Sequence, residues 1–313
     1  MNRLVVEHPG LQTSVQDLGR PGYGAMGVSP SGAADAVSLR LANLLVGNSP
    51  AAAGLEMTLL GGSYVFPEGG VIALAGADFG ASLDGRELEA GVPHSVIPGG
   101  RLRLGQTCSG ARCYLAVAGG VQVDPVLGSA STHLLSGLGG FNGRALQNGD
   151  VLQIGAPSKR LPRRKLATKA RQAFQPRRLL RVTEGPQFDW FLPDGQRALV
   201  QSPFRVTEEA DRMGLRLKGP PLGLRDAKEM ISEGVALGAL QATPSGQAIL
   251  LFIEQQTAGG YPKIANVIGA DLFCIGQLRP RDEIRFECVS FAEARQFWRE
   301  QQQLLNSEEF LFA

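Results

Sequence analysis

The sequence predicts a mainly β protein built from barrels or sandwiches. Short apolar or alternating runs, each bounded by glycine, proline or charged residues, recur along the whole chain. Glycine is abundant, at 41 residues, and aromatic residues make up only 6% of the chain, which is typical of many turns joining short strands. Helical patterns are few and do not alternate with the strands, so a doubly wound parallel sheet is not expected.

The individual elements follow from these runs. The segments predicted as strands are Leu4–Val6, Val71–Leu74, Leu102–Leu104, Cys113–Ala118, Val151–Ile154, Leu199–Gln201, Ile249–Ile253 and Glu283–Phe286. A helix is predicted over Ala34–Val46, because apolar residues recur on one face and Gly47 suits the position after a helix end. A second helix is predicted to begin at the capping box Ser290–Glu293 and to run to about Leu304.

Composition limits the function classes. A chain of 313 residues is long enough for two domains, and 43% hydrophobic with 19% charged residues fits a folded, non-membrane protein. The formal net charge of +2 gives no reason to expect a nucleic-acid or membrane partner. The N-terminus enters a strand pattern without the apolar stretch of a signal peptide, so we expect a cytoplasmic protein.

Cysteine and histidine spacing gives no metal signature. The four cysteines, Cys108, Cys113, Cys274 and Cys288, have no C-x-x-C spacing, and the three histidines lie far apart in sequence. We therefore expect no metal site. We expect buried thiols rather than a Cys108–Cys113 disulfide, although that pairing stays open.

The chain also carries an approximate internal repeat, which indicates two copies of one β-rich fold. Leu4 matches Leu180 at an offset of 176, Asp35-x-x-x-Leu-Arg-Leu matches Asp211-x-x-x-Leu-Arg-Leu, and Pro98–Leu104 matches Pro280–Phe286 at an offset of 182. The predicted domains are residues 1–157 and 177–313. Between them, residues 158–176 form a basic segment without acids, interpreted as an exposed linker or, alternatively, as a contact for phosphate or an acidic partner.

The most unusual segment is Gln12–Asp35, where charged and polar residues stand among several glycines between an apolar strand and an apolar helix. Core segments rarely look like this, since each buried charge needs a partner. Arg20 suits a bidentate contact with a carboxylate or phosphate, and Asp17 could orient it or only pair with it to hold a loop. Gln16, Asp17 and Arg20 are therefore candidate catalytic residues.

A second candidate segment is Glu254–Lys263, which leaves a buried strand and enters polar residues and a double glycine. Backbone N–H groups in such a turn can form an anion-binding nest. Gln256 and Thr257 offer neutral hydrogen-bonding groups suited to an amide or lactam, and Lys263 adds a charge. The alternative is an ordinary solvated turn.

These motifs, taken in order, resemble the biotin-dependent carboxyltransferase / allophanate hydrolase subunit 2 family. The matching motifs are Thr13-x-x-Gln-Asp-x-Gly-Arg-x-Gly, Gly32-Ala-x-Asp, Ala42-Asn-x-Leu-Val-Gly-Asn, Tyr114-Leu-Ala-Val-Ala-Gly-Gly, Asp211-Arg-Met-Gly-Leu-Arg-Leu, Ser232-Glu-Gly and Gln256-Thr-Ala-Gly-Gly-Tyr-Pro-Lys. The resemblance covers essentially the whole chain. Within the family, a stand-alone chain of this length is most similar to the 5-oxoprolinase subunits of type C.

The resemblance implies two cyclophilin-like β-barrel domains with few short helices. It implies one component of an enzyme complex, inactive alone, that opens 5-oxo-L-proline to L-glutamate at the expense of ATP. The implied partners are a related B-type subunit, similar to allophanate hydrolase subunit 1, and an A-type subunit.

The residues that match family motifs fall into a catalytic and a substrate-binding set. The catalytic set is Gln16, Asp17, Arg20, Gln256, Thr257 and Lys263, and the substrate-binding set is Asp211, Arg212, Gly259, Gly260 and Tyr261.

Two other functions remain compatible with the family. One is a carboxyltransferase that uses biotin on a separate carrier protein and acts on urea or a similar amide. The other is a non-catalytic regulator that antagonises a kinase inhibitor.

The sequence also departs from the family pattern. Gln255 stands where the family usually has arginine, which removes a charge that could hold an anion. Pro280-Arg-Asp replaces the usual Pro-Gly-Asp, so a turn that does not require glycine is expected there.

Overall fold

The computed structural model describes residues 2–158, 164–225 and 230–313. The chain divides into two compact units. Unit 1 contains the residues up to Arg20, residues 31–175 and residues 307–313, whereas unit 2 contains residues 21–30 and 176–306. The domain ranges 1–157 and 177–313 stay a prediction. The units differ from them in the two short segments 21–30 and 307–313, and unit 1 extends to Gln175 whereas unit 2 resumes at Pro176.

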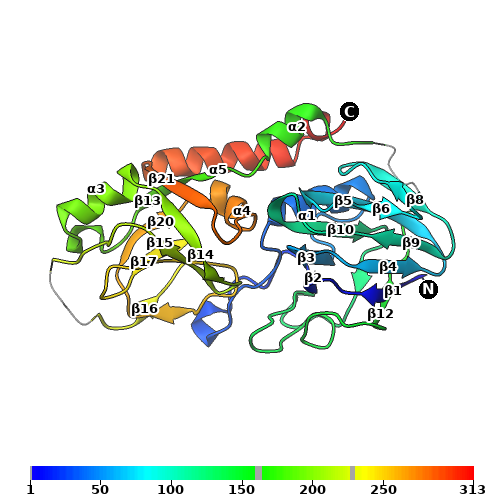
Figure 1. Ribbon diagram of the computed structural model, residues 1–313, viewed down its shortest axis with the longest axis horizontal. Coiled ribbons are helices and arrows are strands. Elements are labelled where there is room, and N and C mark those ends of the chain that lie inside the picture. Colours follow the sequence, from blue (N-terminus) through cyan, green and yellow to red (C-terminus); the bar gives the residue numbers. More distant parts are fainter. Residues whose placement is uncertain (1, 159–163, 226–229) are drawn as a thin grey trace. The chain divides into compact units, whose positions relative to one another are not determined.

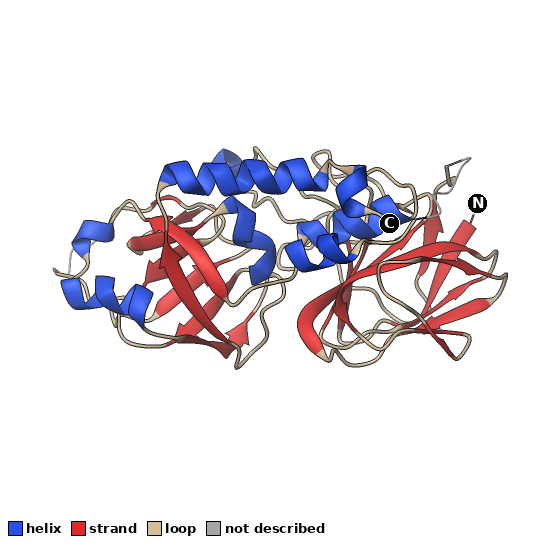
Figure 2. Ribbon diagram, turned by 90° about the horizontal axis from the view of Figure 1, so that it is seen from above, coloured by secondary structure: helices blue, strands red, loops and turns tan. Residues whose placement is uncertain are grey.

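Strands dominate both units, which confirms the predicted mainly β class (Figures 1 and 2). No helix among the described residues is long and apolar enough to cross a bilayer. All four cysteines carry free thiols. Cys113 and Cys274 are buried as expected, but Cys108 and Cys288 are exposed, so that prediction is wrong for the second pair.

Unit 1 consists of two antiparallel sheets. The first has seven strands in the order β11-β12-β1-β4-β9-β6-β7, and the second has five in the order β2-β3-β10-β5-β8. In the first sheet the strands are β1 (Asn2–His8), β4 (Ser63–Phe66), β6 (Ser82–Leu83), β7 (Arg86–Glu87), β9 (Gly100–Arg103), β11 (Val121–Gln122) and β12 (Val151–Ile154). In the second they are β2 (Gln12–Gln16), β3 (Gly54–Thr58), β5 (Gly70–Asp78), β8 (Pro93–Val96) and β10 (Ser109–Val117).

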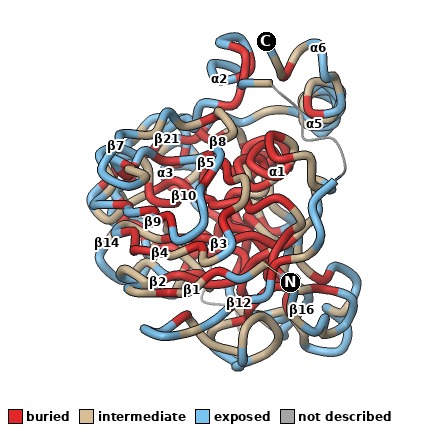
Figure 3. The backbone as a smooth tube through the Cα atoms, turned by 90° about the vertical axis from the view of Figure 1, so that its right-hand side faces the viewer, coloured by how far each residue is buried: buried red, intermediate tan, exposed pale blue. Residues whose placement is uncertain are grey.

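Apolar side chains of both sheets form the core of unit 1. Leu4, Tyr64 and Leu102 of the first sheet and Leu55 and Leu115 of the second are fully inaccessible to solvent. These strands account for much of the buried backbone in Figure 3. Burial of this apolar surface is the main force that holds the sheets together.

Helix α1 (Ala36–Leu45) packs on β5 and β10, at nearly the predicted place. It begins where the Asp35 carboxylate accepts a hydrogen bond from Ser38 N at 2.9 Å, and Gly47 after its end has a left-handed φ of 75°. Two short helices, α2 (Thr168–Ala173) and α6 (Glu308–Leu311), pack on each other in the same unit.

Unit 2 is a closed barrel with the strand order β13-β20-β17-β18-β15-β14-β21. Its strands are β13 (Leu179–Glu184), β14 (Phe204–Ala210), β15 (Gly214–Lys218), β17 (Ala239–Ala242), β18 (Ala248–Leu251), β20 (Lys263–Val267) and β21 (Glu283–Cys288). A separate two-stranded sheet joins β16 (Glu233–Gly234) to β19 (Ala258–Gly259). The short helix α4 is Leu272–Ile275, and α5 (Phe291–Leu305) begins at the predicted capping box of Ser290 and Glu293.

The predicted strand at Leu199–Gln201 is wrong, because these residues end helix α3 (Pro193–Gln201). Pro193 occupies the first turn, where its missing N–H costs nothing, and Gly195 and Leu199 are the buried residues of the helix.

The repeat holds only in part. Leu4 and Leu180 both lie in strands, as do Leu102 and Ile284, but Asp35 begins a helix whereas Asp211 begins the turn into β15. The matched Leu-Arg-Leu segments therefore adopt different secondary structures, a helix and a strand.

The turn at Pro280–Asp282 also differs from expectation. Arg281 has a left-handed φ of 74°, so the turn does adopt the conformation that favours glycine. Arg281 N donates to Val206 O at 2.8 Å, and the side chain pairs with Glu208 at 2.8 Å. These contacts hold a non-glycine residue in an unfavourable backbone conformation.

The basic residues near the predicted linker pair with acids of their own unit. Arg171 contacts Glu89 at 3.2 Å, Arg177 contacts Asp271 at 2.7 Å and Arg178 contacts Asp282 at 2.7 Å. Arg164 pairs with Glu308 at 2.8 Å, and helix α2 lies within the segment. The part of the interpretation that falls on residues 159–163 lies outside the described residues.

Candidate functional site

A cavity of about 270 Å³ lies against the outer wall of the unit 2 barrel. Arg216, Ile249 and Gln241 are direct neighbours across β15, β18 and β17, so their side chains point to the same face of the wall. Their chain neighbours, such as Leu217 and Leu250, are buried in the core. The remaining lining residues are Glu209, Asp211, Met213, Gly214, Leu251, Gln256 and Tyr261.

The polar segment that follows β18 covers this wall. Gln241 is only 1% exposed, and its Nε2 donates to Tyr261 O over a long 3.4 Å. Tyr261 is 41% exposed and stands at the rim, and Gln256 is exposed. The cavity is thus formed by a rigid barrel wall and a polar loop, a common arrangement for binding sites.

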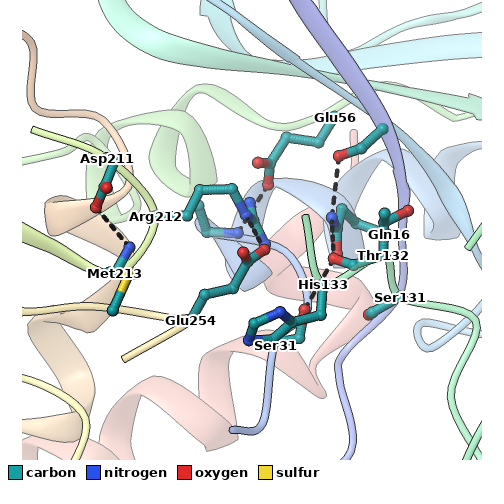
Figure 4. Close-up of polar contacts among 12 residues, drawn as sticks. Gln16, Ser31, Glu56, Ser131, Thr132, His133, Asp211, Arg212, Met213 and Glu254 are labelled. Carbon is teal, nitrogen blue, oxygen red and sulfur yellow. Dashed lines mark hydrogen bonds and ion pairs between the residues drawn. The ribbon is translucent and has the colours of Figure 1, made fainter. Parts of the chain in front are cut away.

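Three of the predicted residues, Asp211, Gln256 and Tyr261, line the cavity together. The Asp211 carboxylate also accepts a hydrogen bond from Met213 N at 2.8 Å (Figure 4). It accepts a second from Gly214 N at 3.1 Å, and the two bonds hold the turn between β14 and β15. A structural role for Asp211 is therefore established.

Arg212 and Glu254 form a buried ion pair, in which Arg212 Nε donates to the Glu254 carboxylate (Figure 4). Glu254 N also donates to Arg212 O at 2.7 Å. The neighbouring Gln255, the departure from the family pattern, is buried and donates to Val235 O at 3.2 Å. Neither Arg212 nor Gln255 lines the cavity.

The other predicted residues of this segment are partly structural. Thr257 O accepts a hydrogen bond from Val235 N at 3.1 Å, and Gly259 pairs with Glu233 in the two-stranded sheet. Lys263 is buried in β20, where its Nζ contacts the Glu233 carboxylate at 2.5 Å. Gln187 joins them, donating to Glu233 at 2.9 Å. Gly260 is half-buried.

The Lys263–Glu233 contact predicts a small contribution to stability that depends on pH. The hydrogen bond from Lys263, followed by that from Gln187, lowers the pKa of Glu233 from its ordinary value of 4.5. A lowered pKa means that the stabilisation is complete above the ordinary value and is lost as pH falls through the folded-state value. We expect Glu233→Gln to lose less stability than the wild type between about pH 5 and pH 3 in denaturant titrations. Equal losses in the two proteins would contradict a stabilising contact.

In unit 1, Gln16, Asp17 and Arg20 all bind one segment, Val126–Thr132. Gln16 Nε2 donates to Thr132 O at 3.0 Å (Figure 4), and Arg20 donates to the carbonyls of Val126 and Ser131. The Asp17 carboxylate accepts four hydrogen bonds, from Gly19 N, Ser129 Oγ, Ala130 N and Ser131 Oγ. These contacts anchor a glycine-rich loop, and a catalytic role for the three residues stays a prediction.

A buried polar cluster beside them was not predicted. Glu56 accepts hydrogen bonds from Tyr114 Oη at 2.7 Å and Ala34 N at 2.8 Å and lies 3.4 Å from Arg112. Tyr114 Oη accepts in turn from Asp35 N at 2.7 Å. Burial, followed by the nearby Glu56 carboxylate, raises the pKa of Tyr114 well above 10, so its hydroxyl stays protonated and donates.

Unit 1 has a larger, shallower cavity of about 870 Å³ along β1, β4 and β9. It is lined by residues such as His8, Ser63 and Arg103, and none of the predicted site residues borders it. The unit 2 cavity is therefore the better candidate site. Its main residue missed by the sequence analysis is Gln241, whose only signal was a lone amide in the apolar strand Ala239–Ala242.

Comparison with known proteins assigns the family. The model of the family described as "Carboxyltransferase domain, subdomain A and B" matches residues 26–288. The chain belongs to this carboxyltransferase family. It is 40% identical over 299 residues to the C subunit of 5-oxoprolinase from Escherichia coli (strain K12), covering 96% of this chain and 95% of that protein.

Two solved structures of larger proteins share the fold of this carboxyltransferase-family chain. The urea amidolyase of K. lactis aligns with a TM-score of 0.90 and 30% identity over 99% of this chain, which spans 20% of that protein. The protein TTHA0988 aligns with a TM-score of 0.82 and 39% identity over 92% of this chain, which spans 55% of it.

Proposed function

We propose that this chain is the C-type subunit of an ATP-dependent 5-oxoprolinase, which hydrolyses 5-oxo-L-proline to L-glutamate. The observation that carries the proposal is the 40% identity to the C subunit of the E. coli enzyme, which extends over nearly the full length of both chains. The urea amidolyase likeness covers only one fifth of a much longer protein and says less about the complete activity.

The chemistry explains why ATP is needed. A five-membered lactam is a stable amide. Transfer of the γ-phosphoryl group of ATP to its oxygen turns that oxygen into a leaving group and makes the ring carbon reactive toward water. Water adds to that carbon and the C–N bond breaks, which gives γ-glutamyl phosphate and the free amine. A second water molecule then hydrolyses this acyl phosphate, so that glutamate and phosphate are released and ADP remains from the first step.

The unit 2 cavity supports a small amide-bearing substrate. It combines the neutral carboxamides of Gln241 and Gln256 with apolar walls from Ile249 and Leu251. Its two charged side chains form an ion pair, with Arg216 Nε 2.9 Å from Glu209 Oε2. The amides match the lactam group of 5-oxoproline by hydrogen-bond type.

The chain is proposed to act in the cytoplasm with B-type and A-type partner subunits, and to be inactive alone. We expect the purified chain to show no 5-oxoproline-dependent ATP hydrolysis, and the three-protein mixture to release phosphate and glutamate together. Strong turnover by the lone chain would contradict the divided site.

The family assignment also favours a second candidate, transfer of a carboxyl group from biotin on a separate carrier to urea or a similar amide. Activity that requires a biotinylated carrier and urea, with none on 5-oxoproline, would establish this candidate instead. Tight binding of partners without turnover on either substrate would indicate a regulator.

A further inference from the structure

Gly259 lies where two glutamine side chains meet. A Cβ atom on Gly259 would lie 2.8 Å from Nε2 of Gln256 and 2.9 Å from Nε2 of Gln241, closer than real Cβ atoms approach other atoms. The φ angle of Gly259 is not in the left-handed region. A side chain at this position would therefore displace the two amide ends, whereas the backbone conformation itself does not call for glycine.

The two amide nitrogens are close enough to act on one ligand atom. Both nitrogens lie within 3 Å of the Cβ position built on Gly259, so they are roughly 6 Å apart at most. One carbonyl oxygen can span that distance by accepting a hydrogen bond of about 2.9 Å from each nitrogen. Gln241 is buried in the barrel wall at 1% exposure, whereas Gln256 approaches from the exposed loop. At 3.4 Å, the bond from the Gln241 amide nitrogen to Tyr261 O is weak, so a ligand oxygen can replace it.

We propose that Gln241 and Gln256 form an amide clamp that recognises the cis-amide edge of a five-membered ring, the lactam of 5-oxoproline. A small ring holds its N–H and C=O on the same side. A primary carboxamide likewise presents an acceptor and a donor on one side, so Gln241 can make two hydrogen bonds to the lactam edge. Gln256 then donates a second bond to the lactam oxygen. The inference rests on the proposed function, whose substrate it adopts.

The same geometry discriminates between substrate and product. Open-chain secondary amides are trans and present N–H and C=O on opposite sides, so they cannot pair with one carboxamide in this way. Glutamate has no amide edge at all, and ring opening removes the contacts to the clamp. A site built to pair with specific polar groups rejects molecules that lack them.

Kinetics of the reconstituted complex test the clamp. We expect Gln241→Met, which keeps the side-chain shape, to lower kcat/KM for 5-oxoproline about 100-fold, chiefly through KM. Gly259→Ala should lower it at least about 10-fold, because its methyl group displaces both flexible amide ends while the backbone remains allowed. Gln247→Met on the same hairpin and Gly234→Ala, where a Cβ has open space, should leave it within about twofold.

Neutral ring compounds test the recognised edge. 2-Pyrrolidinone should compete with 5-oxoproline in the wild-type complex but not in Gln241→Met, and N-methyl-2-pyrrolidinone, which lacks the N–H, should not compete. The ureido ring of biotin has the same cyclic N–H and C=O edge, so 2-imidazolidinone is the third probe. Competition by 2-imidazolidinone alone would overturn the lactam assignment.

The outcomes separate this inference from the proposed function. If the wild-type complex shows no 5-oxoproline-dependent turnover, the proposed function fails. If the wild type is active and Gln241→Met and Gly259→Ala, folded by thermal melting, keep wild-type KM values, the clamp is refuted and the proposed function stands.

Discussion

Replacing Glu56 by alanine is expected to lower the free energy of unfolding by about 3–5 kcal/mol. Glu56 is 2% exposed, and its carboxylate serves Tyr114 Oη, Ala34 N and the Arg112 guanidinium at once. Alanine removes an acceptor from two buried donors and a counter-charge from a buried arginine. The cost is large because buried groups cannot exchange the lost partner for bulk water. Denaturant unfolding of the purified chain measures it.

Two variants separate the contributions to this cluster. Tyr114→Phe removes the hydroxyl that bridges Asp35 N and Glu56 and should cost about 1–3 kcal/mol. Glu56→Gln keeps an acceptor oxygen but loses the charge that faces Arg112. Its loss of unfolding free energy should lie between the losses of Tyr114→Phe and Glu56→Ala. A loss below about 1 kcal/mol for Glu56→Ala would show that the cluster does not stabilise the fold.

The fold could be predicted from local patterns where a segment was long enough to show its period. Helix α1 and the capping box of Ser290 were found because several turns, or a reciprocal pair of side chains, lie close in sequence. Leu199–Gln201 was misread because three residues fit a strand and a helix equally well. Pro193, at the first turn of α3, was the available signal.

The candidate site was harder, since its contacts cross the barrel. Gln256 and Tyr261 are recognisable in the sequence as polar residues beside glycines. Gln241 lies in a four-residue apolar strand, and its role depends on the register that places it beside Ile249. That register, and the approach of its amide to Gly259, follow from barrel closure and leave no local trace.

The role of Asp17 also could not be assigned from the sequence alone. Its residue type and glycine-rich surroundings suggested chemistry, and its partners Ser129–Ser131 lie more than 100 positions away in sequence. A carboxylate in a glycine-rich loop can be a base or an anchor. The distinction depends on which donors the folded chain brings to it.

Asp17→Ala is expected to cost roughly 4 kcal/mol of stability, with activity lost only as far as the fold is lost. The variant leaves Ala130 N, Gly19 N and two serine hydroxyls without their charged acceptor and releases the loop that they anchor. Asp17→Asn should lose less, because its amide oxygen still accepts from three of the donors while its NH₂ group faces the fourth. Denaturant unfolding and turnover of the reconstituted complex are measured on both variants.

Gln256→Ala is expected to affect substrate binding and not stability, since Gln256 is an exposed side chain that lines the cavity. It should leave stability within about 0.5 kcal/mol of wild type and raise KM about 10-fold. A folded Asp17→Ala protein with normal stability and no turnover at saturating 5-oxoproline would make Asp17 a catalytic group. That result would move the reaction centre from the barrel wall of unit 2 to the glycine-rich loop of unit 1.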